Sequence, residues 1–332
     1  MAGQGLEGLV LGKFLPPHAG HLHLVETARA AVDRLTVLVC SLAREPIAGT
    51  LRHAWMRELC PSAHVVHVDE ELPQEPAESA DFWPRWIAAI RRHVPRGPDL
   101  VFTSEAYGDE LARRLGARHV AVDRERRRFP ISGTRVRADP LAAWPFLPGP
   151  VRAHFVKRVA VFGSESTGKT VLAERLARTY GTVWVPEHAR AYLDAKGTLE
   201  PGDLDAIARG QVADEDRLAR VAERVLFCDT ELDTTVIYGE AYFGAVPAGL
   251  RAAAAARRYD LYLLCDIDVP WVADRWRDFG DRRAEMHARF VGALAKRTAP
   301  VQRIAGTWDE RFASARSAVD ALLGLTEAGK AG

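Results

Sequence analysis

The chain has 332 residues, of which 48% are hydrophobic and 27% are charged, and its formal net charge is +1. This length predicts about two domains, each with an ordinary apolar core. The balanced charge argues against a broad basic surface for DNA or for an anionic membrane.

Cysteine spacing and hydropathy narrow the class of protein further. The four cysteines show no CxxC pair or other spacing typical of metal ligands, and three of them lie in apolar runs, which predicts buried reduced thiols. The N-terminus lacks the basic and apolar regions of a signal peptide, and no run approaches the roughly 20 apolar residues of a membrane span. We therefore expect a cytoplasmic protein without membrane insertion.

Strand-like apolar runs alternate with amphipathic helical stretches along the whole chain, a pattern that indicates α/β domains with parallel sheets. The expected strands are Leu6–Leu11, Leu35–Ser41, His64–Val68, Leu100–Thr103, His119–Val122, Arg158–Phe162, Thr182–Val185, Val225–Asp229, Leu261–Asp266 and Pro300–Ile304. The stretch Trp144–Phe155 holds three prolines and a glycine. It predicts a boundary between a first domain, residues 1–150, and a second, residues 151–330.

The first strand leads into "GKFLPPHAGH", Gly12–His21, and then into a helix expected over His21–Val32. His18 and His21 therefore lie on a strand-to-helix turn, where backbone N–H groups and the helix N-terminus favour anions. Two histidines in this place could hold a polyphosphate, bind a metal or simply pack. The residues of the turn alone leave these alternatives open.

A second turn of the same kind lies near the end of the first domain, in "FPISGTRVRADP", Phe129–Pro140. Ser132 and Thr134 offer hydroxyl groups to a phosphate at the start of a short helix, and Arg137 adds a charge one turn later. A phosphate-binding turn near each end of one α/β domain is more specific than either turn alone.

The second domain begins with "VAVFGSESTGKT", Val159–Thr170, in which a strand precedes the P-loop pattern GxxxxGK[ST]. Lys169 is expected to reach the β- and γ-phosphates of ATP, and the Thr170 hydroxyl to ligate Mg²⁺. The expected nucleotide-binding residues are Gly163, Ser164, Glu165, Ser166, Thr167, Gly168, Lys169 and Thr170.

Three further groups fit a phosphotransferase. Asp229 ends an apolar strand and is the expected second Mg²⁺ ligand, with a turn or cap residue as the alternative. Glu187 could accept a proton from a substrate hydroxyl and Arg190 could clamp the phosphoryl group, although a solvated Glu–Arg pair fits the spacing nearly as well. The arginine-rich stretch 269–283 is typical of a mobile lid, with an exposed helix end as the alternative, and its candidate phosphate ligands are Arg275 and Arg277.

"GKFLPPHAGH" and "ISGTRVR" resemble the two signatures of the nucleotidyltransferase superfamily that attaches AMP to small phosphates. Their position before a P-loop kinase resembles the NadR family. "RHAW", "FWPRW", "LVFTSEAYGDELARRLG", "PEHARAYL", "DTELDTT", "PWVADRWRDFG" and "WDERF" resemble that family in the same order, so the resemblance runs from Gly8 to near residue 325. The first strand begins near residue 6, so we expect the form without an N-terminal helix-turn-helix, and no DNA binding.

The resemblance implies a Rossmann-like HxGH nucleotidyltransferase domain followed by a P-loop kinase domain. It implies ATP-dependent phosphorylation of ribosylnicotinamide to nicotinamide mononucleotide (NMN), and adenylyl transfer from ATP to NMN, which yields NAD and pyrophosphate, with Mg²⁺ as cofactor. These small molecules are the expected partners, and a homo-oligomer is compatible with the sequence. The alternatives are a different nucleoside or phosphate acceptor, or an NAD- or ATP-sensing protein with one weak or inactive half.

The resemblance also assigns roles to single residues. The implied catalytic residues are Lys13, His18, His21 and Arg137 in the first domain and Lys169, Glu187 and Asp229 in the second. The implied ATP-binding residues of the first domain are Gly12, Phe14, Gly20, Ser132 and Thr134. Trp83, Trp86 and Trp271 are candidates to stack on the cationic nicotinamide ring, with packing as the alternative for each.

Overall fold

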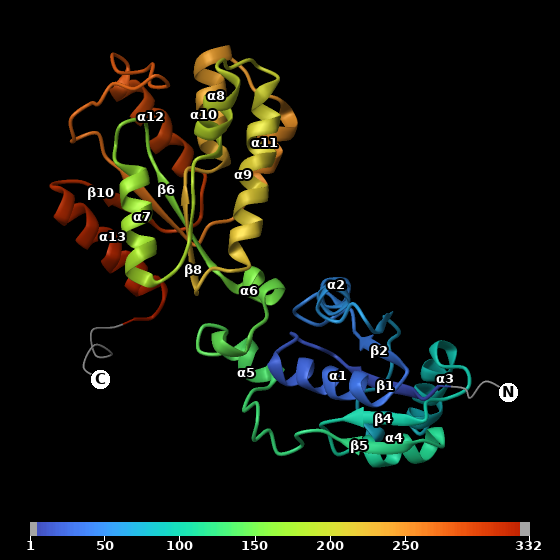
Figure 1. Cartoon of the computed structure of the whole chain (residues 1–332). Coiled ribbons are helices and arrows are strands. Elements are labelled where there is room, and N and C mark those ends of the chain that lie inside the picture. Colours follow the sequence, from blue (N-terminus) through green and yellow to red (C-terminus); the bar gives the residue numbers. More distant parts are fainter. Residues whose placement is uncertain (1–4, 326–332) are drawn as a thin grey trace. The chain divides into compact units, whose positions relative to one another are not determined.

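The computed structural model describes residues 5–325 and divides the chain into two units, residues 1–151 and 152–332 (Figure 1). The division falls within the proline- and glycine-containing stretch Trp144–Phe155, and the predicted end of the second domain at residue 330 lies outside the described residues. Each unit contains one five-stranded sheet in which all the pairings are parallel. The prediction of two parallel α/β sheets is therefore confirmed.

The first unit has the strand order β3-β2-β1-β4-β5. Its strands are β1 (Glu7–Gly12), β2 (Arg34–Cys40), β3 (His64–Val68), β4 (Leu100–Thr103) and β5 (Arg118–Ala121). Its helices are α1 (Ala19–Ala31), α2 (Gly49–Leu59), α3 (Phe82–His93), α4 (Gly108–Leu115) and α5 (Gly133–Ala138), with short 3₁₀ turns at Pro76–Glu78 and Trp144–Phe146; α6 (Gly149–Phe155) spans the division. Strand β1, the first in the chain, is thus the central strand.

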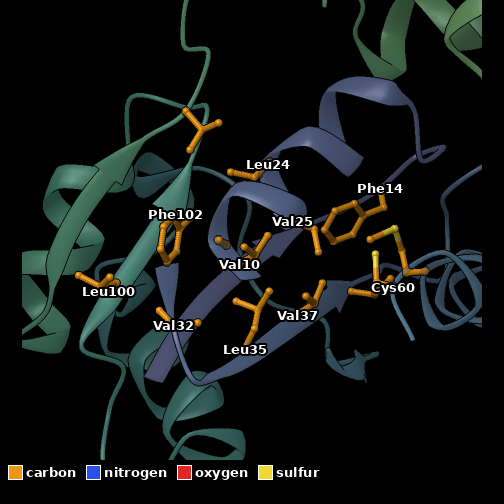
Figure 2. Close-up of a cluster of buried hydrophobic side chains, with 14 residues drawn as sticks. Val10, Phe14, Leu24, Val25, Val32, Leu35, Val37, Cys60, Leu100 and Phe102 are labelled. Atoms are coloured by element: carbon orange, nitrogen blue, oxygen red, sulfur yellow. The ribbon is translucent and has the colours of Figure 1, made fainter. Parts of the chain in front are cut away.

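Both faces of this sheet are covered, because successive side chains of a strand point to opposite faces. Val10 of β1 lies in a core cluster with Val25 of α1 and Met56 of α2 (Figure 2). Its neighbours along the strand, Leu9 and Leu11, lie in a second cluster that includes residues of α3 and α4. Burial on both faces explains why β1 is a continuous apolar run instead of an alternating one.

The second unit has the strand order β10-β9-β6-β8-β7. Its strands are β6 (Lys157–Phe162), β7 (Trp184–Val185), β8 (Val225–Asp229), β9 (Leu261–Cys265) and β10 (Val301–Ile304). Its helices are α7 (Lys169–Tyr180), α8 (His188–Lys196), α9 (Asp203–Ala219), α10 (Leu232–Phe243), α11 (Ala248–Ala256), α12 (Arg283–Leu294) and α13 (Trp308–Leu322). Strand β6 is again both the first of its unit and the central one.

The sheet of the second unit is also packed on both sides. Val161 of β6 clusters with residues of α7 and α13, while the ring of Phe162 lies 4.8 Å from that of Phe290 on α12. Among residues 5–325, no helix has the length and apolar character needed to cross a membrane. The four cysteines within this range are free and buried, as expected for the three that lie in apolar runs.

The predicted strands agree with the structure to within two residues, and the differences have local causes. Strand β7 begins at Trp184 instead of Thr182, because the Thr182 backbone N–H donates to the Ala177 carbonyl and so belongs to the end of α7. Helix α1 begins at Ala19 instead of His21, because the His18 carbonyl already accepts the first helical hydrogen bonds.

Candidate active sites

Each central strand ends at a cavity. The turn after β1 borders a cavity of about 720 Å³, and the loop after β6 borders one of about 450 Å³. These volumes fall in the range of small-molecule sites, and the carboxyl ends of central parallel strands are where α/β folds bind ligands. The two candidate sites therefore occupy equivalent places in their own sheets.

The two predicted histidines lie together in the first cavity. Their rings are stacked, with centroids 3.7 Å apart and planes inclined by 19°. The Nδ1 atoms of His18 and His21 are buried, and neither has a hydrogen-bond partner among the described residues. A Cβ atom at Gly20 would lie 3.2 Å from the His18 ring, so glycine permits this close approach.

Both imidazoles are neutral at pH 7. Burial lowers the pKa of His18 to about 4, and burial also lowers the pKa of His21 well below its ordinary value. The charge of Arg126 acts in the same direction on both rings. A neutral imidazole carries one N–H donor, so each ring can give one hydrogen bond to a phosphate oxygen. Within residues 5–325, no group of three His, Cys, Asp or Glu side chains is placed to hold a metal.

Lys13 is held on the same turn by two residues of the following segment. Its ammonium group lies 3.0 Å from Glu45 Oε1, and Arg52 Nη2 lies 2.5 Å from Glu45 Oε2. Arg52 is completely buried and also donates through Nη1 to the Lys13 carbonyl at 2.5 Å. No sequence motif indicated a role for Glu45, and "RHAW" indicated Arg52 only through the family resemblance.

The second predicted phosphate-binding turn, in "ISGTRVR", is hydrogen-bonded to the turn that follows β1. Arg137 of α5 donates through Nη1 to the Leu15 carbonyl at 2.5 Å, and through Nη2 to Thr134 Oγ1 at 3.4 Å. A Cβ atom at Gly133 would lie 2.5 Å from the Leu15 carbonyl oxygen, which explains the glycine in "ISGT". The predicted residues that border the cavity are Gly12, Lys13, Phe14, His18, Gly20, His21, Ser132, Thr134 and Arg137. Two motifs far apart in sequence thus meet at one site.

Trp83 and Trp86 also border the first cavity, but both side chains make contacts with other residues of the chain. Trp86 Nε1 donates to the Pro73 carbonyl at 2.8 Å, and the Arg114 guanidinium lies 4.9 Å from the Trp83 ring centroid. A further cation, Arg126, borders the cavity and belongs to no predicted motif. It is one of four arginines between positions 124 and 128, and nothing in that run indicates which one faces the site.

The P-loop between β6 and α7 has the backbone that its glycines require. Gly163 has φ = 142° and Gly168 has φ = 81°, which side-chain-bearing residues rarely adopt. A Cβ atom at Gly163 would also lie 2.8 Å from the Cys265 carbonyl oxygen. Lys169 Nζ donates to the Ser164 carbonyl at 2.8 Å, inside the loop. Of the predicted loop residues, Glu165, Ser166, Thr167, Gly168, Lys169 and Thr170 border the second cavity.

The two predicted Mg²⁺ ligands are in contact. Thr170 Oγ1 donates to Asp229 Oδ2 at 2.5 Å, so residues from α7 and the end of β8 meet here. Asp229 is only 1% exposed, and its Oδ1 atom is buried without a hydrogen-bond partner among the described residues. Burial raises the pKa of this carboxyl to about 6, and Lys169 opposes that rise. An unpaired buried acceptor beside a hydroxyl oxygen fits a hard cation.

The remaining kinase candidates divide into two groups. Glu187, the N-cap residue of α8, and Arg190 border the second cavity together with Arg277. Arg190 is paired with Asp274 at 2.5 Å. Arg275 and Trp271 are not part of the cavity wall; Trp276 is, and the Arg275 guanidinium lies 4.5 Å from its ring centroid.

Residues 269–282 form an irregular segment without a helix, unlike the helix-end alternative. This segment is attached to the P-loop. The Val272 N–H donates to Ser166 Oγ at 2.8 Å, and the Phe279 N–H donates to Glu165 Oε2 at 3.4 Å. Burial raises the pKa of Glu165 to about 7, so this carboxyl titrates near neutrality.

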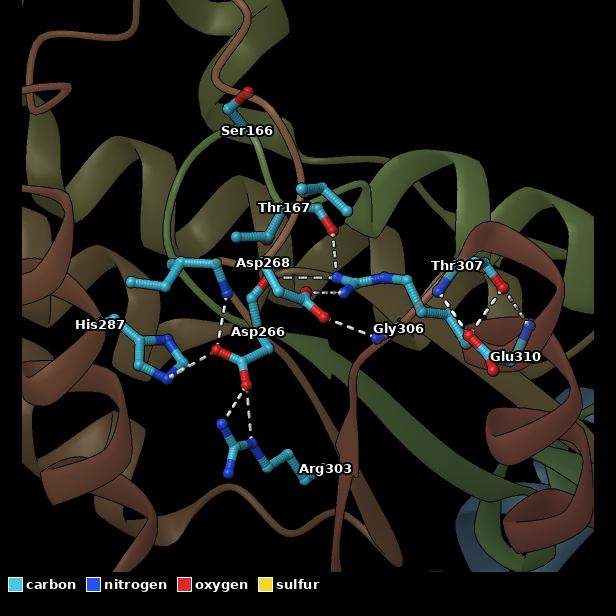
Figure 3. A network of polar contacts seen from close by, with 12 residues as sticks. Ser166, Thr167, Asp266, Asp268, His287, Arg303, Gly306, Thr307 and Glu310 are labelled. Atoms are coloured by element: carbon cyan, nitrogen blue, oxygen red, sulfur yellow. Dashed lines mark hydrogen bonds and ion pairs between the residues drawn. The ribbon is translucent and has the colours of Figure 1, made fainter.

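Helix α13 also contacts the P-loop, within the network of polar contacts drawn in Figure 3. Arg311, only 2% exposed, donates through Nη2 to the Thr167 carbonyl at 2.9 Å and to the Asp266 carbonyl at 3.1 Å, and its Nη1 is paired with Asp268. The Trp308 ring packs so closely on Gly168 that a Cβ atom at this position would lie 2.5 Å from the ring. The family-like stretch "WDERF" thus positions the phosphate-binding loop.

Comparisons with known proteins agree with this arrangement. A cytidylyltransferase-like family model matches residues 9–139, and an AAA domain model matches residues 158–311. The trifunctional NAD biosynthesis/regulator protein NadR of Salmonella typhimurium LT2 is 31% identical over 301 residues, which cover 83% of this chain and 73% of that protein. This chain belongs to the NadR family. The NadR protein of Escherichia coli K12 is 29% identical over 343 residues, covering 96% of this chain and 83% of that protein.

Solved NadR structures share the fold. A NadR protein in complex with NR superposes with a TM-score of 0.79 at 24% identity, with 96% of both chains covered. A NadR protein in complex with NAD and AMP-PNP gives a TM-score of 0.76 at 24% identity, with 97% of both chains covered. The two family-model matches of this NadR-family chain lie in its two units, one in each.

Proposed function

We propose that this NadR-family chain makes NAD in two steps, each on its own sheet. The second unit would phosphorylate ribosylnicotinamide to NMN, and the first unit would join NMN to the adenylyl group of ATP. The observation that supports this most is that each unit has its own phosphate-binding loop and its own cavity at the end of its central strand. The choice of nicotinamide compounds rests on the family and on the names of its members.

In the kinase step, the 5′-hydroxyl oxygen of ribosylnicotinamide attacks the γ-phosphorus of ATP. The bond between the γ-phosphorus and its bridging oxygen breaks, ADP leaves, and the hydroxyl proton passes to Glu187. Lys169 neutralises charge on the β- and γ-phosphates, and Arg190 and Arg277 add positive charge from the cavity wall. Little covalent chemistry is left for the protein, so positioning and charge carry the rate.

Magnesium has a fitting site in this unit. The unpaired Oδ1 of Asp229 and the Thr170 hydroxyl would hold the ion, with waters and ATP oxygens completing its shell. When bound, Mg²⁺ neutralises charge on the β- and γ-phosphates. The second carboxylate oxygen of Asp229 keeps its hydrogen bond with Thr170, which orients both groups.

In the adenylyl step, a phosphate oxygen of NMN attacks the α-phosphorus of ATP in line. The bond from the α-phosphorus to the bridging oxygen breaks, and pyrophosphate leaves with the electron pair. The neutral rings of His18 and His21 donate hydrogen bonds to oxygens that gain charge, and Lys13 and Arg137 supply positive charge. Trp83 and Trp86 border the same cavity and suit the cationic nicotinamide ring.

The test is to incubate the protein with Mg·ATP and ribosylnicotinamide and to follow NMN and NAD by chromatography. Lys169→Ala should block NMN formation, and His18→Ala should block only NAD formation, by roughly 10²–10³-fold for one lost donor. If NMN accumulates and no NAD appears even when NMN is supplied, the first unit is a sensor or has another acceptor. If neither product forms, the nicotinamide assignment fails and a panel of other nucleosides comes next.

A further inference from the structure

A loop of the first unit, residues 123–129 between β5 and α5, brings one arginine to the HxGH histidines. Arg126 borders the cavity with His18 and His21, and its positive charge already contributes to their lowered pKa values. Its backbone has φ = 51°, a left-handed conformation that is uncommon for residues other than glycine. Asp123 stabilises this shape by accepting hydrogen bonds from the backbone N–H groups of Arg128 and Phe129, both at 3.2 Å.

The Arg126 side chain is paired with a carboxylate that is itself exposed to water. Its Nη2 atom lies 2.8 Å from Glu105 Oε1, and the two side chains are 43% and 52% exposed. An ion pair that is this exposed contributes little to stability, so exchanging Glu105 for another anion costs little. By contrast, Lys13 is paired with a Glu45 that is only 7% exposed, and Arg137 donates to the Leu15 carbonyl.

We propose that Arg126 is a catalytic residue of the first unit: its guanidinium leaves Glu105 and binds the phosphate oxygens of the reacting nucleotides beside His18 and His21. This inference rests on the adenylyl transfer proposed above. Neutral imidazoles give hydrogen bonds but no net charge, whereas several phosphates meet in this cavity. A guanidinium remains charged at any working pH and presents paired donors that match phosphate oxygens.

The rival interpretation is structural, with the Arg126–Glu105 pair tying the loop to the turn after β4. The two interpretations predict opposite effects for Glu105→Ala. If the pair only ties the loop, removing either partner does the same damage. If Arg126 binds phosphate, removing Glu105 releases a competitor and strengthens ATP binding.

The experiment measures adenylyl transfer from Mg·ATP to supplied NMN, with kcat and the KM for ATP determined separately. We expect Arg126→Ala to lower kcat/KM by about 10²-fold, Arg126→Lys to fall between it and the wild type, and Glu105→Ala to lower the KM for ATP. The matched control is Arg127→Ala, since Arg127 is 83% exposed, is paired with Glu125 and should leave the rate unchanged. Phosphorylation of ribosylnicotinamide by the same preparations reports that the second unit is folded and active.

An Arg126→Ala rate within about threefold of the wild type, or an equal loss in Glu105→Ala, would overturn the inference. If the wild-type chain shows no adenylyl transfer, the proposed function fails, and Arg126 is then judged by binding. In a Lys169→Ala background, which weakens the second site, the affinity for AMP-PNP should fall about tenfold on Arg126→Ala. An unchanged affinity there would reject Arg126 as a phosphate ligand.

Discussion

Arg311 offers a quantitative test of how the P-loop is held. In Arg311→Met the Thr167 and Asp266 carbonyls lose a buried donor, and each such loss costs about 1–3 kcal/mol. Asp268 is 37% exposed, so water replaces its partner and the loss of that pair adds little. The expected destabilisation of the second unit is therefore about 2–6 kcal/mol. For a unit of this size it lowers the midpoint of thermal unfolding by on the order of 10 °C.

The measurement is calorimetric unfolding of the full chain, combined with the KM for ATP in the phosphorylation assay. Arg303→Met is the matched control, because Arg303 also pairs with Asp266 but its side chain is 71% exposed. That change leaves Arg311 on the Thr167 carbonyl, so the KM for ATP should stay at the wild-type value. We expect the KM for ATP to rise in Arg311→Met, because the Thr167 carbonyl loses its anchor. An unchanged KM for ATP in Arg311→Met, or an equal rise in Arg303→Met, would refute the assignment of Arg311 to the P-loop.

Three further predictions concern pH and packing. The pKa of His18 in the folded chain is about 4, below its ordinary 6.5, so the unfolded chain binds the proton more tightly. The stability present above pH 6.5 should therefore be lost as the pH falls towards 4, by on the order of 3 kcal/mol. Thermal unfolding of His18→Gln should show a smaller dependence of stability on pH. Because the pKa of Asp229 is about 6, the rate of phosphorylation at limiting Mg²⁺ should fall as the pH drops through 6 and should recover with excess Mg²⁺. A rate at low pH that does not change with the Mg²⁺ concentration would contradict the role of Asp229 as a Mg²⁺ ligand. In Gly133→Ala the new Cβ atom clashes with the Leu15 carbonyl oxygen, so the rate of adenylyl transfer should fall at least about tenfold while phosphorylation persists. Both rates are measured on one preparation of the variant.

Much of the fold could be predicted from the sequence because both sheets are buried on two sides. Such strands are continuous apolar runs, which are easily recognised in a sequence, and the phosphate motifs follow directly after them. His18 lies on the turn after β1, Lys169 begins α7 and Asp229 ends β8, positions that follow from the local spacing of the motifs.

The residues that the sequence could not reveal act across long stretches of chain. Glu45 matters because it contacts Lys13, and Arg311 because it contacts a carbonyl more than 100 residues away. Arg126 was hidden in a run of arginines, and the loop that orients it has a left-handed backbone at both Asp123 and Arg126. Trp276 borders the second cavity where Trp271 was expected, because the path of an irregular lid leaves no periodic signal in the sequence.

The strand order of the two sheets has a consequence for how the protein is made. In each unit the central strand leaves the ribosome first, yet its neighbours arrive much later: β1 pairs with β2 and β4, and β6 pairs with β8 and β9. The P-loop is therefore translated about 60 residues before Asp229 and about 100 before the Cys265 carbonyl against which Gly163 packs. A nascent chain that ends before β9 holds every residue of the P-loop motif and lacks the strand that shapes it, so nucleotide binding during synthesis should begin only after β9 has emerged.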